Sequence, residues 1–305
     1  MEKYLPEFSG LRVGREVGEG IVYEPLKRPL TVYDLLRHTA GLTYGVFFRS
    51  PVKGLYLEAG VDRFDLSREV FLERLAALPL RFQPGETFEY GLATDLLGHL
   101  LEALAGRSLA ELLEERLFRP LGMKDSGFQA KDPARLAQPF PKDPETGHSL
   151  RLLPVETPPP RYAGGMGGVG TAADYLAFLE ALRLGRGALS PTMAGFMVQD
   201  HLGSLYPEAL KRGPEYLPGP GYSFGLGVAV RVEPMGYSPG ALGEWTWAGF
   251  GGTFFFVDPL QEITALYLAQ APNLLSVLEP EKALHSRLGA RLQHAFRTLV
   301  YLGLE

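Results

Sequence analysis

The chain has 305 residues, of which 46% are hydrophobic and 21% charged, and its formal net charge is −5. These values are typical of a soluble globular protein and exclude a strongly basic track for nucleic acid or for an anionic membrane surface. Because cysteine is absent, disulfides, thiolate catalysis and cysteine-rich metal sites are excluded as well. We therefore expect no metal, no cofactor and no nucleic-acid partner, and a small neutral ligand.

No apolar run is long enough to span a bilayer, and the first residues, MEKYLPEFSG, lack the basic and apolar regions of a signal peptide. The protein is expected in the cytoplasm if Met1 is the true start. Abundant Leu, Arg, Glu and Pro with a single asparagine, Asn273, suit a heat-adapted protein, and a GC-rich genome gives the same bias. The sequence leaves the oligomeric state open, including a homo-oligomer.

Apolar spacing and capping residues predict a series of helices in the first two thirds of the chain. Ser108 and Glu111 have the spacing of a capping box, and Gly106 ends the helix before them. Residues 131–161 are rich in proline and predict a long surface loop. The predicted helices cover residues 32–39, 68–77, 93–105, 109–118 and 173–185, with Thr31, Ser67, Ser108 and Thr171 as N-caps.

From Tyr222 onward the pattern changes to β-type runs: YSFGLGVAVRV, EWTWAG, GTFFFVD and EITALYLAQ. These runs predict an antiparallel meander, and residues 280–301 predict an amphipathic helix that can cover it. A helical middle followed by a sheet and a terminal helix indicates the α+β class. We expect one domain, with a helical lobe over about residues 31–210 and a sheet lobe over about residues 221–305.

Two short motifs resemble known functional patterns but lack the required context. Residues 165–170 read G-x-G-x-x-G, yet the proline-rich ETPPPRYA stands where a dinucleotide fingerprint needs a strand. Residues 221–225 read G-x-S-x-G, yet a strand follows Ser223 where a nucleophile elbow needs a helix. We therefore predict a glycine turn at the first motif and an ordinary strand residue at the second.

Ser50-Pro-Val-Lys53 has the S-x-x-K spelling of a serine nucleophile with its activating lysine. Ser50 as an N-cap and Pro51 as the first helical residue are favourable at a helix start, and Lys53 would then lie over the serine. Gly54 weakens this helix, so the flanking residues are predicted as a loop. Ser50 and Lys53 remain a candidate catalytic pair at this point.

The histidines show no metal-ligand spacing. His99 and His294 fall within predicted helices and are expected to be structural. His38 lies at the end of its helix, where we expect it to bond the terminal carbonyls.

Four stretches are informative when taken in order: LTVYDLLRHTAGLTYG (30–45), the segment 81–128 that begins RFQPGETFEYGLATD, AGGMGGVGTAADYLAFLEAL (163–182) and WTWAGFGGTFFFVDP (245–259). Together they resemble the serine β-lactamase and penicillin-binding-protein superfamily, and within it the class C β-lactamase-like esterases (family VIII carboxylesterases). This resemblance covers nearly the whole chain. It implies a β-lactamase/transpeptidase-like fold, and a small ester or β-lactam-like molecule as the ligand.

The resemblance assigns roles to two sites. Tyr90 matches the tyrosine that shuttles a proton in the family, and because a phenol has a pKa of about 10 it needs a nearby cation to act as a base. Trp247, Ala248 and Gly249 match the third motif, whose strand gives the N–H of Phe250 as an oxyanion donor. Leu92 replaces the asparagine of the second motif, and Trp247 replaces the lysine of the third. Both changes favour neutral acyl esters over β-lactams.

The nucleophile departs from the family pattern. MEKYLPEF is similar to a phrase that follows S-x-x-K in the family, so the nucleophile, the first strands and the central helix are expected before Met1. Ser50 lies after the segment that it should precede and has no role in the family. We expect a serine esterase that acts through an acyl-enzyme, with residues 1–305 inactive alone. The alternatives are a non-catalytic ligand-binding protein and catalysis by Ser50 and Lys53 with Tyr90.

Overall fold

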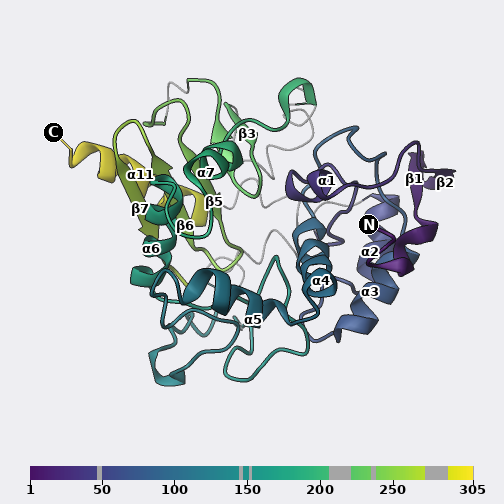
Figure 1. Cartoon of the computed structure of the whole chain (residues 1–305), viewed down its shortest axis with the longest axis horizontal. Coiled ribbons are helices and arrows are strands. Elements are labelled where there is room, and N and C mark those ends of the chain that lie inside the picture. The colour runs from purple at the N-terminus through teal and green to yellow at the C-terminus, as the bar shows by residue number, and fades with distance from the viewer. Residues whose placement is uncertain are drawn as a thin grey trace.

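The computed structural model describes residues 1–46, 50–143, 147–150, 153–205, 221–234, 238–271 and 288–304. Figure 1 shows the sheet in one half of the molecule, and α1 to α4 with a β-hairpin in the other. The α-helices are α1 (Val32–Leu36), α2 (Pro51–Ala59), α3 (Arg68–Ala77), α4 (Ala93–Ala105), α5 (Leu109–Leu113), α6 (Ala172–Arg183), α7 (Pro191–Met197) and α11 (Leu288–Leu302). No helix among the described residues combines the length and the apolar character that a bilayer span needs.

The predicted helix starts are confirmed. Thr31 and Ser108 each form a capping box, while Ser67 and Thr171 each accept a backbone N–H of the first turn. The predicted bounds of α4 are also confirmed, and Gly106 closes this helix in the left-handed conformation with φ 64°. Helix α1 ends at Leu36, three residues before the predicted end, because His38 has a left-handed backbone with φ 54°.

Residues 51–59 form helix α2, so the loop predicted after Gly54 is wrong, while the loop predicted at residues 47–49 lies outside the described part of the chain. Ser50 is its N-cap, and the helix buries one face through Val52, Lys53 and Tyr56. A glycine inside a helix costs about 0.5–1 kcal/mol relative to alanine. Complete burial of one large apolar side chain contributes about 1.5–3 kcal/mol. Tyr56 alone therefore outweighs the helix-breaking effect of Gly54.

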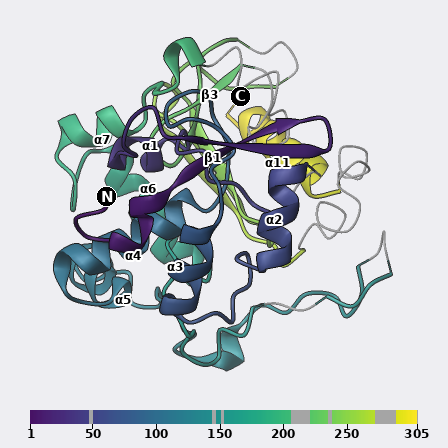
Figure 2. The ribbon, with the colours of Figure 1, turned by 90° about the vertical axis from the view of Figure 1, so that its right-hand side faces the viewer.

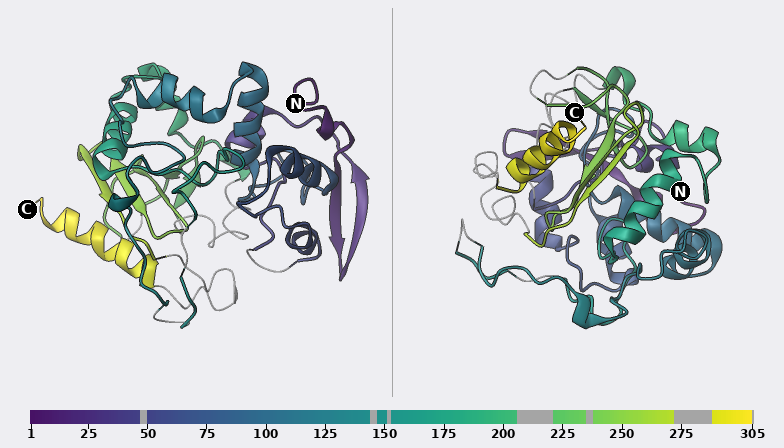
Figure 3. Two further views of the ribbon diagram at one scale, coloured as in Figure 1. Left: turned by 90° about the horizontal axis from the view of Figure 1, so that it is seen from below. Right: turned by 90° about the vertical axis from the view of Figure 1, so that its left-hand side faces the viewer.

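The predicted antiparallel meander is confirmed, with the strand order β3-β4-β5-β6-β7. Its strands are β3 (Tyr222–Phe224), β4 (Ala229–Arg231), β5 (Trp245–Ala248), β6 (Phe254–Asp258) and β7 (Ile263–Tyr267). Figure 3 shows α6 on one face of this sheet and α11 on the other. Strand β6 alternates accordingly, with Phe255 packed toward α6 and Phe256 toward α11. The predicted α+β class is confirmed by this architecture.

The final helix and helix α6 differ from the ranges predicted for them. The final helix was predicted over residues 280–301, and α11 covers Leu288–Leu302, while residues 280–287 lie outside the described part of the chain. Helix α6 falls within the range predicted as the helical lobe, yet its Leu179 and Leu182 pack against the sheet. The reason is that α6 places its apolar face over strands that come later in the chain.

The N-terminal hairpin was not predicted. Strands β1 (Arg12–Val17) and β2 (Gly20–Pro25) pair antiparallel, and Gly18 and Glu19 form the turn between them. Val13 anchors β1 to the helical half through a bridge to Leu80. Figure 2 shows the hairpin near α2, with the teal segment of the predicted surface loop extending away from the body. Among the described residues of that loop the only helical turn is Pro133–Arg135.

The glycine-rich motif before α6 has a packing explanation. A Cβ atom added at Gly165 would lie 2.5 Å from Oδ2 of Asp95, and one at Gly164 would collide with the carbonyl of Thr94. Side chains at these positions would push the segment off α4. Glycine is therefore required at residues 164 and 165 because the segment lies directly against α4.

Candidate functional site

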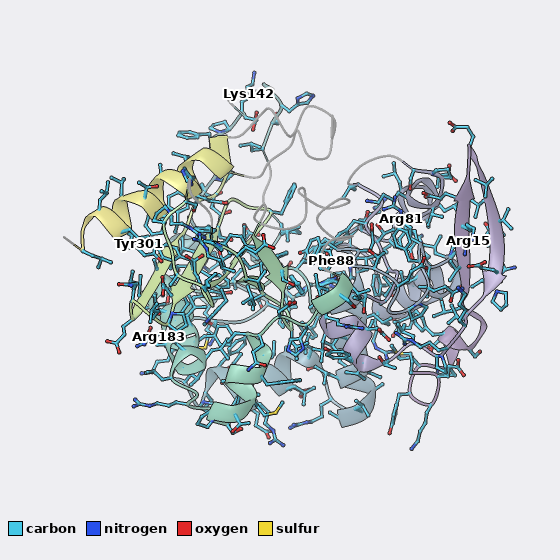
Figure 4. All side chains as sticks on the ribbon, turned by 90° about the horizontal axis from the view of Figure 1, so that it is seen from above. Arg15, Arg81, Phe88, Lys142, Arg183 and Tyr301 are labelled. Atoms are coloured by element: carbon cyan, nitrogen blue, oxygen red, sulfur yellow. The ribbon has the colours of Figure 1, made fainter. Side chains whose placement is uncertain are left out.

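Tyr90 lies between the two halves of the molecule. It is partly buried and packs against both the core of the helical half and a small cluster that includes Phe88, Tyr222 and Phe224. Phe88, which is labelled in Figure 4, lies between the sheet half and the helical half. The segment before α4 therefore places Tyr90 at the junction of two separately formed cores.

The structure brings Tyr90 next to Trp247 of strand β5. Their ring centroids are 5.2 Å apart, and the two side chains share a hydrogen bond. Because the indole N–H is the only polar group of tryptophan and can only donate, the phenolic oxygen accepts this bond. Phe224 also packs against Trp247 in a T-shaped arrangement, with ring centroids 5.2 Å apart. Two predicted site residues from distant parts of the sequence thus meet.

The surroundings of Tyr90 hold its hydroxyl in the protonated form. Burial raises the pKa of Tyr90, the hydrogen bond from Trp247 lowers it, and the negative charge of Asp95 raises it, with a net increase. The negative charge of Asp95 therefore adds to the effect of burial in keeping this phenol protonated. Tyr90 can serve as a proton donor here, and it needs a cation beside it to serve as a base.

A second tyrosine and a buried ion pair adjoin Tyr90. The ring of Tyr44 lies 5.5 Å from that of Tyr90, and burial together with the charge of Asp95 raises the pKa of Tyr44 well above its usual value. Asp95 pairs with Arg161 at 3.2 Å, and both side chains are buried. The second oxygen of Asp95 has no hydrogen-bond partner among the described residues.

Sequence reasoning did not select Tyr44, Asp95 or Arg161. A signal was present for Asp95, because it lies on the apolar stripe of α4 between Leu92 and Leu96, where a carboxylate needs a partner. That partner, Arg161, comes from a proline-rich loop and gives no periodic pattern.

His38 supports the backbone around Tyr90. Its Nδ1 accepts the N–H of Gly91 at 3.4 Å, and its Nε2 lies 3.2 Å from Oγ1 of Thr94. Burial lowers the pKa of His38 to about 3, so the ring is neutral at physiological pH and carries its proton on Nε2. The prediction that His38 bonds the terminal carbonyls of its helix is wrong, because the left-handed backbone turns the ring toward α4.

The second-motif segment is packed tightly. A Cβ added at Gly91 would lie 2.5 Å from both the carbonyl oxygen of Leu42 and the Cα of Thr43, so only glycine fits there. Leu92, at the asparagine position of the motif, is fully buried in the helical half. The motif therefore offers a ligand the phenol of Tyr90 but no side-chain amide.

The third-motif strand ends at a tight turn. Strand β5 stops at Ala248, and the N–H of Gly249 donates to the carbonyl of Thr253 at 2.8 Å. The side chains of Ala248 and Phe250 are exposed. No described residue accepts a backbone hydrogen bond from the N–H of Phe250. This geometry is compatible with the oxyanion role predicted for Phe250.

Ser50 and Lys53 are placed differently. Ser50 caps α2 by accepting the N–H of Lys53 at 3.4 Å. The ammonium of Lys53 forms an ion pair with Glu89 at 3.2 Å, and both side chains are almost completely buried. The structure therefore directs Lys53 toward the residue that precedes Tyr90.

No group of His, Asp or Glu residues in the described ranges is arranged to hold a metal ion.

Comparisons with known proteins agree on one family. The family model described as Beta-lactamase matches residues 1–285. Esterase EstB of Burkholderia gladioli is 33% identical over 287 residues, which are 87% of this chain and 68% of EstB. Lovastatin esterase of Penicillium rubens is 30% identical over 269 residues, which are 81% of this chain and 66% of that protein.

The structural comparison finds a similar fold in a solved hydrolase. The solved structure of EstCE1, described as a hydrolase with promiscuous acyltransferase activity, has a TM-score of 0.70 and 29% identity. The match covers 93% of this chain and 77% of EstCE1. The chain spans about two thirds of the length of each of the two esterases named above, and 65% of the length of two curated relatives from Mycobacterium tuberculosis.

Proposed function

Because the chain belongs to the β-lactamase family, we propose that it forms the substrate-facing part of a serine hydrolase that cleaves small neutral esters through an acyl-enzyme. EstB and EstCE1 are an esterase and a hydrolase by name, which supports ester chemistry. The observation that carries the proposal is the contact between Tyr90 and Trp247, with ring centroids 5.2 Å apart.

In this proposal Tyr90 moves the proton of the reaction. With the lysine of the nucleophile segment beside it as the cation, the Tyr90 phenolate accepts the proton of the serine hydroxyl as the serine oxygen attacks the ester carbonyl. It then gives that proton to the leaving alcohol as the ester bond breaks, and the hydrogen bond from Trp247 stabilises the phenolate. The N–H of Phe250 donates to the carbonyl oxygen as negative charge develops on it. A water molecule then attacks the acyl-enzyme, Tyr90 accepts its proton, and Tyr90 returns that proton to the serine oxygen as the acyl–serine bond breaks.

The residues at two motif positions support neutral substrates. Leu92 is buried and apolar, and Trp247 carries no charge. A β-lactam or peptide carboxylate would lose its usual cationic partner at the third motif, whereas an uncharged ester needs none. We infer that short acyl esters are hydrolysed faster than β-lactams.

We also propose that residues 1–305 form no acyl-enzyme by themselves. Ser50-Pro-Val-Lys53 is the only S-x-x-K of the sequence, and its lysine is paired with Glu89 at 3.2 Å. A lysine that shares its charge with a buried carboxylate is a poor activator of a serine hydroxyl. The nucleophile is then expected on polypeptide outside these residues.

Intact-mass measurement after incubation with a fluorophosphonate tests this proposal, with Ser50→Ala as the control variant. We expect no adduct on residues 1–305, and a single adduct with p-nitrophenyl butyrate hydrolysis once an upstream in-frame S-x-x-K segment is included. An adduct that disappears in Ser50→Ala would instead establish catalysis by Ser50. A longer protein that remains unlabelled while it binds esters saturably would favour the alternative of a binding protein.

A further inference from the structure

Glu89 is a buried junction between four segments. Its carboxylate lies 3.2 Å from Nζ of Lys53 on α2 and 2.9 Å from Nη1 of Arg81, and it accepts a hydrogen bond from Oγ1 of Thr43 at 2.6 Å. Its backbone N–H donates to the carbonyl of His38 at 2.8 Å. Only 1% of the Glu89 side chain and 2% of the Lys53 side chain are exposed, so this ion pair is shielded from water, whereas Arg81 remains 21% exposed.

This junction adjoins both tyrosines of the candidate site. Glu89 directly precedes Tyr90, and Thr43 directly precedes Tyr44. A single carboxylate therefore ties together the two backbone segments whose rings lie 5.5 Å apart. A shift of Glu89 would displace both phenols at once.

Lys53 occupies a position where packing alone favours an apolar residue. Its neighbours on the buried face of α2, Val52 and Tyr56, are both fully buried. Burying an ammonium and a carboxylate costs free energy, and apolar residues of similar volume often serve stability as well or better. We explain the buried ammonium of Lys53 by its ion pair with Glu89, which fixes the position of that carboxylate.

We propose that Lys53 and Glu89 are positioning residues, whose buried ion pair fixes the backbone segments that carry Tyr44 and Tyr90. The catalytic meaning of this positioning rests on the proposed function, but the positioning itself does not. In this reading Ser50 is a helix cap, and the lysine of Ser50-Pro-Val-Lys53 acts on the site through Glu89.

Fluorine NMR of protein labelled with 3-fluorotyrosine measures the positions of the tyrosines directly. The 14 tyrosines give separate probes, and Tyr44→Phe and Tyr90→Phe assign the two that matter. We expect Lys53→Met to displace the resonances of both Tyr44 and Tyr90 by more than a linewidth. The conservative Lys53→Arg variant keeps the charge and is expected to leave both near their wild-type positions.

Arg297→Met is the matched control. Arg297 forms a buried ion pair with Glu244 at 2.6 Å, and the hydroxyls of Tyr222 and Tyr301 bond to that same carboxylate. This variant should move the resonances of Tyr222 and Tyr301 and leave those of Tyr44 and Tyr90 in place. If Lys53→Met does not fold, Glu89→Gln supplies the same test, because it keeps the side-chain shape and removes the charge.

A folded Lys53→Met or Glu89→Gln protein with wild-type resonances for Tyr44 and Tyr90 would overturn the proposal. An equal displacement of all four tyrosines in both Lys53→Met and Arg297→Met would also overturn it, because it would indicate general loosening. Ester hydrolysis is measured separately, in a protein that contains the nucleophile. A tenfold or larger loss of kcat with unchanged KM is expected for Lys53→Met there, and absence of any wild-type hydrolysis would count against the proposed function alone.

Discussion

The phenolic oxygen of Tyr90 accepts a hydrogen bond from Trp247, and this bond joins the segment before α4 to strand β5. Both residues pack against the small cluster that includes Phe88 and Phe224, while Tyr90 also packs against the core of the helical half and Trp247 against the core between the sheet and α6. Because the bond stabilises the phenolate, it opposes the effect of burial on the pKa of Tyr90. A ligand that reaches Tyr90 therefore meets a proton donor whose acidity depends on the sheet half of the molecule.

Replacing Trp247 tests this dependence. Trp247→Phe removes the N–H donor while keeping an aromatic ring, so the pKa of Tyr90 should rise further. The measurement is the titration of the Tyr90 resonance in protein labelled with 3-fluorotyrosine. Trp245→Phe is the control, because Trp245 packs with Phe255 and α6. An unchanged Tyr90 titration in Trp247→Phe would show that the hydrogen bond has no influence.

Replacing Tyr90 tests its proton-transfer role. In a protein that contains the nucleophile, Tyr90→Phe should lower kcat for a p-nitrophenyl ester by roughly 10²- to 10⁴-fold, the usual contribution of general acid–base catalysis. Tyr175→Phe is a suitable control, since Tyr175 lies on α6 against Phe178 and Phe255. Equal losses of kcat in both variants would argue against a specific role for Tyr90.

Replacement of Gly91 or Gly54 by alanine should change the free energy of unfolding in opposite directions. Gly91→Ala places a methyl group 2.5 Å from the backbone of residues 42 and 43, and overpacking of this kind costs about 1–3 kcal/mol of unfolding free energy. Gly54→Ala meets no atom within 4 Å inside helix α2, and should add about 0.5–1 kcal/mol. Urea unfolding of the two variants measures both changes, and a stabilised Gly91→Ala protein would contradict the close packing.

His38 should make the protein sensitive to acid. Its folded pKa is about 3 because of burial, which is below the value of about 6.5 for an exposed histidine. The folded state therefore binds fewer protons, and stability falls as the pH drops from about 6.5 toward 3, by up to about 1.4 kcal/mol per pH unit from this group. Unfolding free energies at pH 7.5, 5.5 and 4.5 should decrease less steeply in His38→Gln than in the wild type. If the unfolding free energy of both proteins decreased equally with pH, His38 would not be the cause of the acid sensitivity.

Asp62 should make the protein less stable as the pH rises, whereas His38 makes it less stable as the pH falls. Burial raises the pKa of Asp62 to about 6, while its backbone bond from Gly45 at 2.8 Å partly opposes this increase. The folded state binds the extra proton, so the contribution of Asp62 to stability is complete below about pH 4 and is lost as the pH rises through 6. Asp62→Asn keeps an acceptor for Gly45 and should be more stable than the wild type at pH 8 but not at pH 4. A variant with equal gains at both pH values would not fit this origin.

Local chemistry made much of the fold predictable. Thr31, Ser67, Ser108 and Thr171 cap their helices as their side chains require, because an N-cap bond forms within four residues of chain. The alternating β-type runs in the last third of the chain likewise predicted the antiparallel meander, because this pattern is also local in the sequence. Helix α2 and the β1–β2 hairpin escaped prediction, because burial of Tyr56 and of Val13 against distant residues stabilises them.

The candidate site divides in the same way. The sequence motifs that contain Tyr90 and Trp247 made both residues candidates for the site through their resemblance to a known family. The roles that this resemblance implies remain predictions. The sequence alone could not show that Lys53 pairs with Glu89 or that Asp95 pairs with Arg161. Each of these pairs joins side chains that are far apart along the chain and that require burial to gain a strong mutual preference. The sequence by itself determined the capped helices and the strands of the meander, and through the family resemblance it made Tyr90 and Trp247 candidates, because these signals are local. Only the tertiary structure decided which charges share the space around the two residues, because burial sets their mutual preference.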